Sequence, residues 1–197
     1  ESLDRSGGRF DLRGGRQAAI LSVANWQPAK GLESLLEAFS CLPEELATLH
    51  LVGDRRLETD YGRAIWERVS QPDLESRVVV HGCIEPAALG SYYSSADLFA
   101  LASKGETYGS VYAEALSAGL PIVGWKTGNL PHLIDHEVDG LLVDFGRVEE
   151  LADSLRRLCV DPTLRGAMSQ RALARASNLP SWTDTTRKVL EALNVGA

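Results

Sequence analysis

Short apolar runs alternate along the chain with longer segments in which apolar residues recur every three or four positions. The short runs have the length of buried strands, and the longer segments have the period of helices that bury one face. Strands that alternate with helices favour βαβ units and therefore a parallel sheet. The expected strands cover residues 18–23, 48–52, 78–81, 98–101, 122–125 and 140–143.

The helices expected between these strands have ordinary stop signals. A helix over residues 109–118, for example, is followed by Gly119 and Pro121, which are both typical of helix ends. The other expected helices cover residues 31–41, 60–70, 86–94, 130–134, 148–159, 162–176 and 182–193. The predicted fold class is α/β, with a Rossmann-like, doubly wound parallel sheet of about six strands that binds ligands at the carboxyl ends of its strands.

Composition and length agree with one compact domain. The chain has 197 residues, of which 44% are hydrophobic and 24% charged, which is ordinary for a globular domain with a sizeable core. A net charge of -7 argues against a nucleic-acid surface. Residues 1–16 are rich in Gly, Arg and Asp and suggest a flexible arm or the remnant of an interdomain linker before a domain over residues 17–197. No apolar run approaches the roughly 20 residues of a membrane span.

The three cysteines, Cys41, Cys83 and Cys159, are odd in number and have no metal-like spacing. We interpret them as buried thiols in a reducing compartment, which indicates the cytoplasm. The chain has no Asp-x-Asp pattern, so no metal and no cofactor are expected.

The stretch between the fourth and fifth expected strands carries the most chemistry. Glu106 and Glu114 lie on either side of Gly109, which opens a helix. Glycine there lets a ligand approach the backbone, and the N–H groups of Ser110 and Val111 favour an anion. Either glutamate alone is more often simply solvated or stabilised by the helix dipole. Together, two carboxylates that accept hydroxyl hydrogen bonds beside an anion site describe a nucleotide-sugar, with one glutamate on the ribose and one on the sugar.

These residues resemble a known motif. The pattern of Glu106, Tyr108-Gly109, Glu114-Ala115 and Ala118-Gly119-x-Pro121 resembles the paired-glutamate motif of the group-1 family of retaining glycosyltransferases with the GT-B fold. The resemblance covers residues 18–193. It includes the first strand with its Lys30-Gly31 turn, the second strand with Gly53-Asp54, the third with Gly82, the Tyr92 to Asp97 junction and Pro180-Ser181-Trp182. It implies the C-terminal, donor-binding half of a two-domain enzyme, whose N-terminal, acceptor-binding half is absent from this chain.

The resemblance also implies roles for individual residues. Glu106 would hold the hydroxyls of the transferred sugar and Glu114 the ribose, while Lys30 and the amides at the helix start would hold the diphosphate. Lys30 would offset charge on the leaving group, so Lys30 and Glu106 are the candidate catalytic residues. The other donor-binding candidates are Asn25, Gly53, Gly82, Ile84, Thr107, Tyr108, Gly109, Ser110 and Val111. The backbone around Gly82 and Ile84 is implied to contact the nucleobase.

The chain departs from the family pattern in several places. Asn25 stands where the family has a phosphate-binding arginine, and Thr107 where it commonly has glycine. The loop after the fifth strand lacks the family's second glycine and its glutamate, and we assign His132 in that loop no role in the site.

The expected function is donor binding for transfer of a sugar, of the hexosyltransferase type and with retained configuration, within a longer chain. The isolated domain is expected to be inactive. Its partners would be the nucleotide-sugar and the missing half, which would also make any membrane contact. One alternative is a non-catalytic nucleotide-sugar-binding or scaffold module, which Asn25 supports. A nicotinamide-dependent oxidoreductase shares the fold class, but residues 24–27 lack the G-x-G-x-x-G pattern that such an enzyme requires.

Overall fold

The computed structural model describes residues 10–179, which form one six-stranded sheet. All strand pairs are parallel, and the spatial order is β3-β2-β1-β4-β5-β6. The strands are β1 (Ala18–Val23), β2 (Ala47–Val52), β3 (Val78–Gly82), β4 (Leu98–Leu101), β5 (Ile122–Trp125) and β6 (Gly140–Val143). This order is that of a doubly wound fold, in which the chain changes direction across the sheet between β1 and β4. The predicted fold class is confirmed.

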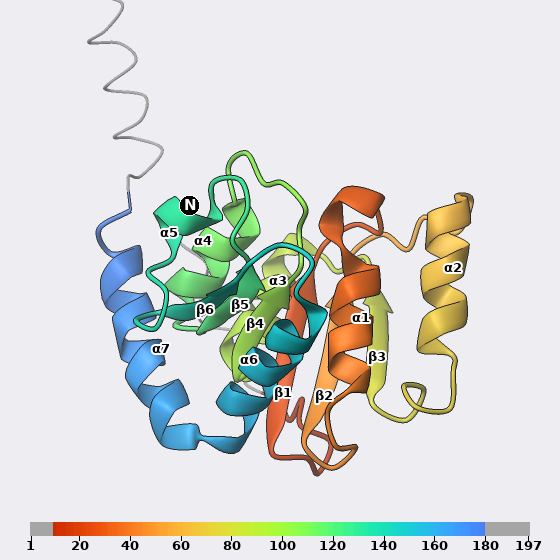
Figure 1. Cartoon of the computed structure of the whole chain (residues 1–197), viewed down its shortest axis with the longest axis horizontal. Coiled ribbons are helices and arrows are strands. Elements are labelled where there is room, and N and C mark those ends of the chain that lie inside the picture. Colours follow the sequence, from red (N-terminus) through yellow and green to blue (C-terminus); the bar gives the residue numbers. More distant parts are fainter. Residues whose placement is uncertain (1–9, 180–197) are drawn as a thin grey trace, which may run out of the picture.

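The helices pack on both faces of this sheet. Helix α1 packs against α2 and α6, whereas α4 packs against α7. Figure 1 shows α1 and α6 in front of the sheet, with α2 beside α1. The helices are α1 (Leu32–Ser40), α2 (Asp60–Val69), α3 (Pro86–Ser95), α4 (Ser110–Ser117), α5 (Leu130–Leu133), α6 (Val148–Val160) and α7 (Pro162–Ala176), with a 3-10 turn, η1 (Pro28–Lys30), before α1. The helix expected over residues 182–193 lies outside the described residues.

Helices cover both faces of the sheet, which explains why the central strands are continuous apolar runs in the sequence. Every residue of β4 and of β5 is buried, so these strands are continuously apolar rather than alternating. The edge strand β3 differs, because its Val78 is buried whereas Val79 is 40% exposed. The central strands therefore form a rigid base for the loops at their carboxyl ends.

Residues 10–16 pack on the domain, unlike the flexible arm expected over residues 1–16. Leu12 is buried. The guanidinium of Arg13 forms two hydrogen bonds with the Asp97 carboxylate, at 2.8 and 2.6 Å. Arg16 donates to the carbonyl oxygens of Glu44 and Ser76. Charged composition suggested a solvated arm, but these arginines find specific acceptors on the domain.

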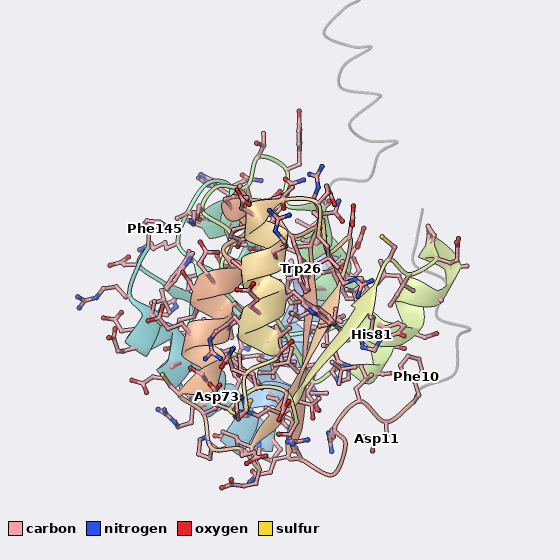
Figure 2. All side chains as sticks on the ribbon, turned by 90° about the vertical axis from the view of Figure 1, so that its right-hand side faces the viewer. Phe10, Asp11, Trp26, Asp73, His81 and Phe145 are labelled. Carbon is pink, nitrogen blue, oxygen red and sulfur yellow. The ribbon has the colours of Figure 1, made fainter. Side chains whose placement is uncertain are left out.

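A histidine pair lies beneath this segment. The Nε2 atom of His50 lies 2.7 Å from the Leu12 carbonyl oxygen and must donate to it, so Nδ1 of a neutral His50 accepts from His81 Nε2, at 2.9 Å. The His81 ring packs edge-on against Tyr92, which also contacts Phe10. Figure 2 shows His81 and Phe10 on the same side of the molecule. Burial lowers the pKa of both histidines, that of His81 to about 4.

The prediction of three buried cysteines is wrong for two of them. Cys159 is buried in α6, but Cys41 and Cys83 are exposed. Cys41 caps the carboxyl end of α1, and Cys83 lies in the loop that follows β3, where the chain leaves the core. Within residues 10–179, no helix has both the length and the apolar composition to cross a membrane.

Candidate functional site

Lys30 and Glu106 meet at the point where the sheet changes direction. Lys30 ends the 3-10 turn after β1, and Glu106 lies in the loop between β4 and α4. The Nζ atom of Lys30 lies 2.8 Å from Oε2 of Glu106. The side chains are 27% and 15% exposed, respectively, so water screens this ion pair only in part. The two candidate catalytic residues, predicted separately from the sequence, are thus in direct contact.

Close backbone packing positions Lys30. Gly31 has a left-handed φ of 62°, and a Cβ atom there would lie 1.9 Å from the carbonyl oxygen of Ala102. The turn therefore rests directly on the end of β4. Two hydrogen bonds join it to the next loop, since the Ala29 carbonyl accepts from the Lys104 N–H (2.8 Å) and the Ser103 hydroxyl (3.1 Å).

The loop after β5 supports Glu106 from the other side. A Cβ atom on Gly128 would lie 2.6 Å from both the nitrogen and the oxygen of the Glu106 backbone. The Asn129 N–H donates to the Glu106 carbonyl at 2.9 Å, and the Thr127 hydroxyl donates to the Ser103 carbonyl at 2.8 Å. Ser103, Thr127 and Gly128 each follow a buried strand, and their place at the strand ends predicts that they face the same crevice as Lys30 and Glu106. The sequence assigned them no binding role, and the structure shows that they support the Glu106 loop.

A second ion pair engages Lys104, which lies in the loop between β4 and α4. Lys104 Nζ lies 2.6 Å from Oε1 of Glu33, and the hydroxyl of Tyr61 donates to the other oxygen of that carboxylate. Burial opposes ionisation of Glu33, but the hydrogen bonds from Lys104 and Tyr61 outweigh it and lower its pKa. Burial is the main cause that raises the pKa of Tyr61, and the Glu33 carboxylate raises it further. Lys104 is thereby directed to Glu33, whereas Lys30 faces Glu106.

Helix α4 begins at Ser110, directly after Gly109. Gly109 caps the helix with a left-handed backbone (φ 72°) and provides no side-chain hydrogen bond to the first turn. A Cβ atom on Gly109 would lie 2.4 Å from Cδ1 of Leu133 in α5. Glycine is therefore favoured at position 109 by its left-handed backbone, and a larger residue would also have to displace the Leu133 side chain, so the approach of a ligand is not the only reason for glycine there. The first amides of α4, on Ser110 and Val111, remain at the positive end of the helix dipole.

Glu114 is held by a buried tyrosine that the sequence analysis missed. The Tyr93 hydroxyl donates to Oε2 of Glu114 at 2.9 Å, and Tyr93 itself is fully buried. Burial is the main cause that raises the pKa of Tyr93, and the charge on Glu114 raises it further. The Tyr93 hydroxyl therefore stays protonated and can donate. Because one oxygen of Glu114 is committed to Tyr93, the other can accept a ligand hydroxyl.

The loops after β1, β2 and β3 contain the remaining candidates. Oδ1 of Asn25 accepts from the Asp54 N–H at 2.9 Å, so Asn25 fixes the neighbouring loop. Gly53 (φ 136°) packs against Ala24, whose carbonyl oxygen would lie 2.2 Å from an added Cβ atom. Gly82 (φ 70°) differs, because an added Cβ atom would meet no atom within 4 Å. Among these glycines, only Gly82 borders open space.

Three other candidates are placed without a specific contact in the site. Ile84 is half-buried and packs against the core. Thr107 is exposed. Tyr108 is 83% exposed, in the loop that carries Glu106.

The sequence profile of the family described as glycosyl transferases group 1 matches residues 9–175 of this chain. The chain belongs to the group 1 glycosyltransferase family. It is 32% identical over 172 residues to a D-inositol 3-phosphate glycosyltransferase of Xylanimonas cellulosilytica, a match that covers 87% of this chain and 41% of the relative.

Solved protein structures share the fold of this chain. The crystal structure of Anabaena Alr3699/HepE in complex with UDP superimposes with a TM-score of 0.82 and 27% identity, over 92% of this chain and 49% of that one. The same protein in complex with UDP-glucose gives a TM-score of 0.80 and 28% identity, over 90% of this chain and 48% of that one. The C-terminal domain of a group 1 glycosyl transferase from Francisella tularensis shares the fold, with a TM-score of 0.75 and 21% identity, over 87% of this chain and 93% of that domain.

The coverage defines which part of the family this chain represents. It spans 41% of the curated relative and 49% of the Anabaena protein, but 93% of the isolated C-terminal domain. The group 1 glycosyltransferase chain described here therefore corresponds to the C-terminal half of a GT-B fold.

Proposed function

We propose that this chain is the donor-binding half of a retaining glycosyltransferase, which holds a nucleotide-sugar at the carboxyl ends of β1 and β4. Another half of the longer protein would supply the acceptor. The contact between Lys30 and Glu106 carries this proposal, because it places a cation suited to a diphosphate beside a carboxylate suited to sugar hydroxyls. The Anabaena relative, solved with UDP and with UDP-glucose, supports the same class of donor.

The diphosphate would bind between Lys30 and the first amides of α4. Gly109 leaves that helix start without a side-chain cap, so the N–H groups of Ser110 and Val111 can donate to phosphate oxygens. When the bond between the sugar and the diphosphate breaks, negative charge gathers on the leaving phosphate. The ammonium group of Lys30 would stabilise that charge.

The sugar and the ribose would each meet one glutamate. Glu106 lies next to Lys30 and would accept hydrogen bonds from the hydroxyls of the sugar. Glu114, oriented by Tyr93, would accept from the ribose with its remaining oxygen. Open space over Gly82, with Ile84 beside it, supports contact between the backbone and the nucleobase there. The contacts of Asn25 and Gly53 support a role in holding the loops, and the exposure of Thr107 and Tyr108 fits contacts with the sugar or with the other half.

One specific observation favours a second function, a non-catalytic binding module. The residue at the position of the family's phosphate-binding arginine, Asn25, uses its side-chain oxygen on the Asp54 backbone and brings no positive charge. Such a module would bind the nucleotide-sugar, but the full-length protein would transfer nothing.

Binding and turnover are tested separately. Calorimetry on this chain with UDP, GDP, ADP and their glucose or mannose esters should show binding of at least one nucleotide class, and the chain alone should transfer no sugar. Failure of every nucleotide to bind would refute the proposed site. Transfer by the chain alone would refute the need for a second half, and an inactive full-length protein that still binds the donor would favour the binding module.

A further inference from the structure

The contact between Lys30 and Glu106 has a consequence for which ligands the site prefers. We propose that this ion pair makes the site discriminate between a nucleotide-sugar and the free nucleoside diphosphate that remains after transfer. In this role Glu106 opposes the diphosphate alone and favours the diphosphate that carries a sugar. This inference rests on the proposed function of the same site.

The pair is specific in the structure. Oε2 of Glu106 lies 2.8 Å from the ammonium of Lys30 and 3.4 Å from the Ser103 hydroxyl. Lys104, in the same loop as Glu106, is paired with Glu33 instead. Within the described residues, Lys30 is therefore the cation that Glu106 contacts.

A free diphosphate would have to compete for this lysine. The ammonium group has three donors, so Lys30 must either leave Glu106 or share its N–H groups between carboxylate and phosphate. In both cases the negative charge of Glu106, which is only 15% exposed, faces an incoming anion with limited screening. Glu106 therefore weakens the binding of a nucleoside diphosphate.

A sugar on the diphosphate reverses the effect. Its hydroxyl groups can donate to Glu106 as Lys30 turns toward the phosphates, so the carboxylate keeps a hydrogen-bond partner. The same side chain thus strengthens the binding of the substrate and weakens the binding of the product. Such a pair would promote product release.

The decisive variant is Glu106→Gln, which keeps the shape but removes the charge. It should tighten UDP binding by about 5-fold, because Lys30 is released and a repulsive charge is lost. It should weaken UDP-glucose binding by about 10-fold, because a charge-assisted hydrogen bond is lost. Calorimetry measures both dissociation constants, and GDP with GDP-mannose or ADP with ADP-glucose replaces this pair if the wild type prefers those bases.

Two matched controls separate the ion pair from general electrostatics. Glu33→Gln removes a neighbouring carboxylate that pairs with Lys104, and it should leave the ratio of the two dissociation constants unchanged. In a Lys30→Gln background, Glu106→Gln should tighten UDP binding by no more than about 2-fold, because no lysine is left to release. Thermal melting curves establish that each variant is folded.

The outcomes distinguish this inference from the proposed function. If the wild type binds no nucleotide, the proposed function fails. If it binds nucleotides but Glu106→Gln weakens UDP or leaves it unchanged, the inference is wrong while the proposed function stands. Tightening that is undiminished in the Lys30→Gln background would also overturn it, because charge alone would then explain the effect.

Discussion

Tyr93 gives the sharpest test of the assigned role of Glu114. We expect Tyr93→Phe to reduce the preference for a ribonucleotide, because Glu114 would lose the donor that fixes its orientation. Phenylalanine fills the same volume, so the change removes one hydroxyl group and creates no large cavity. The variant removes the 2.9 Å hydrogen bond from the Tyr93 hydroxyl to Oε2 of Glu114, together with the longer 3.4 Å contact of that hydroxyl with the Val111 carbonyl oxygen.

The magnitude follows from this bond. Hydrogen bonds to charged groups contribute about 1.5–3 kcal/mol, and the buried Tyr93 hydroxyl makes its short bond to a carboxylate. Tyr93→Phe should lower the free energy of unfolding by an amount near the lower end of that range, because water can partly solvate the half-buried Glu114 carboxylate. Since only its orientation changes, binding of UDP should weaken by roughly 3-fold to 10-fold.

The assay compares UDP with 2′,3′-dideoxy-UDP by calorimetry. The dideoxynucleotide has no ribose hydroxyls for Glu114, so Tyr93→Phe should weaken UDP and leave the dideoxynucleotide unchanged. Tyr112→Phe is the control, because this buried tyrosine donates to the Leu101 carbonyl at 3.0 Å and should affect only stability. Equal losses for both nucleotides in Tyr93→Phe would refute the reasoning.

Three further predictions concern other parts of the domain. Gly31→Ala should lower the free energy of unfolding by at least about 2 kcal/mol in urea, whereas Gly105→Ala, whose added methyl meets no atom within 4 Å, should be nearly neutral. Burial lowers the pKa of His50, and that of His81 to about 4, so below pH 6.5 the unfolded chain binds more protons than the folded chain. The free energy of unfolding should therefore fall as the pH drops from 6.5 towards 4. His81→Gln should flatten this dependence, which denaturation curves at several pH values would measure. Lys30→Ala should weaken UDP binding by roughly 1.5–3 kcal/mol and reduce its dependence on ionic strength, and an unchanged salt series would place the phosphates elsewhere.

The fold could be predicted because its strands are apolar throughout. A run such as β4 or β5 contrasts sharply with the polar loops beside it, and helices on both faces make that contrast continuous along the strand. Element ends were harder to predict. Gly109 was expected inside its helix but lies just before it as a left-handed cap, a property of the backbone that an amino-acid pattern shows only weakly.

The sequence predicted which residues belong to the site, but it did not predict which of them touch each other. Lys30 and Glu106 are far apart in the sequence and meet only because β1 and β4 are neighbours in the sheet. The bond between Asn25 and Asp54 likewise depends on the parallel pairing of β1 with β2. The role of Tyr93 was hidden for another reason, since a buried aromatic residue usually contributes only to the core.

Hydrogen bonds fix the loop that carries Glu106 on both of its sides, to Ala29 before α1 and to Asn129 after β5. A ligand that binds there would meet groups already in place, so little conformational entropy would be lost on this side of the site. Calorimetry should then show a small entropic penalty for the phosphate and sugar contacts. The exposed Tyr108 belongs to the same loop but takes no part in these hydrogen bonds. A substitution of Tyr108 should therefore leave Lys30 and Glu106 in place.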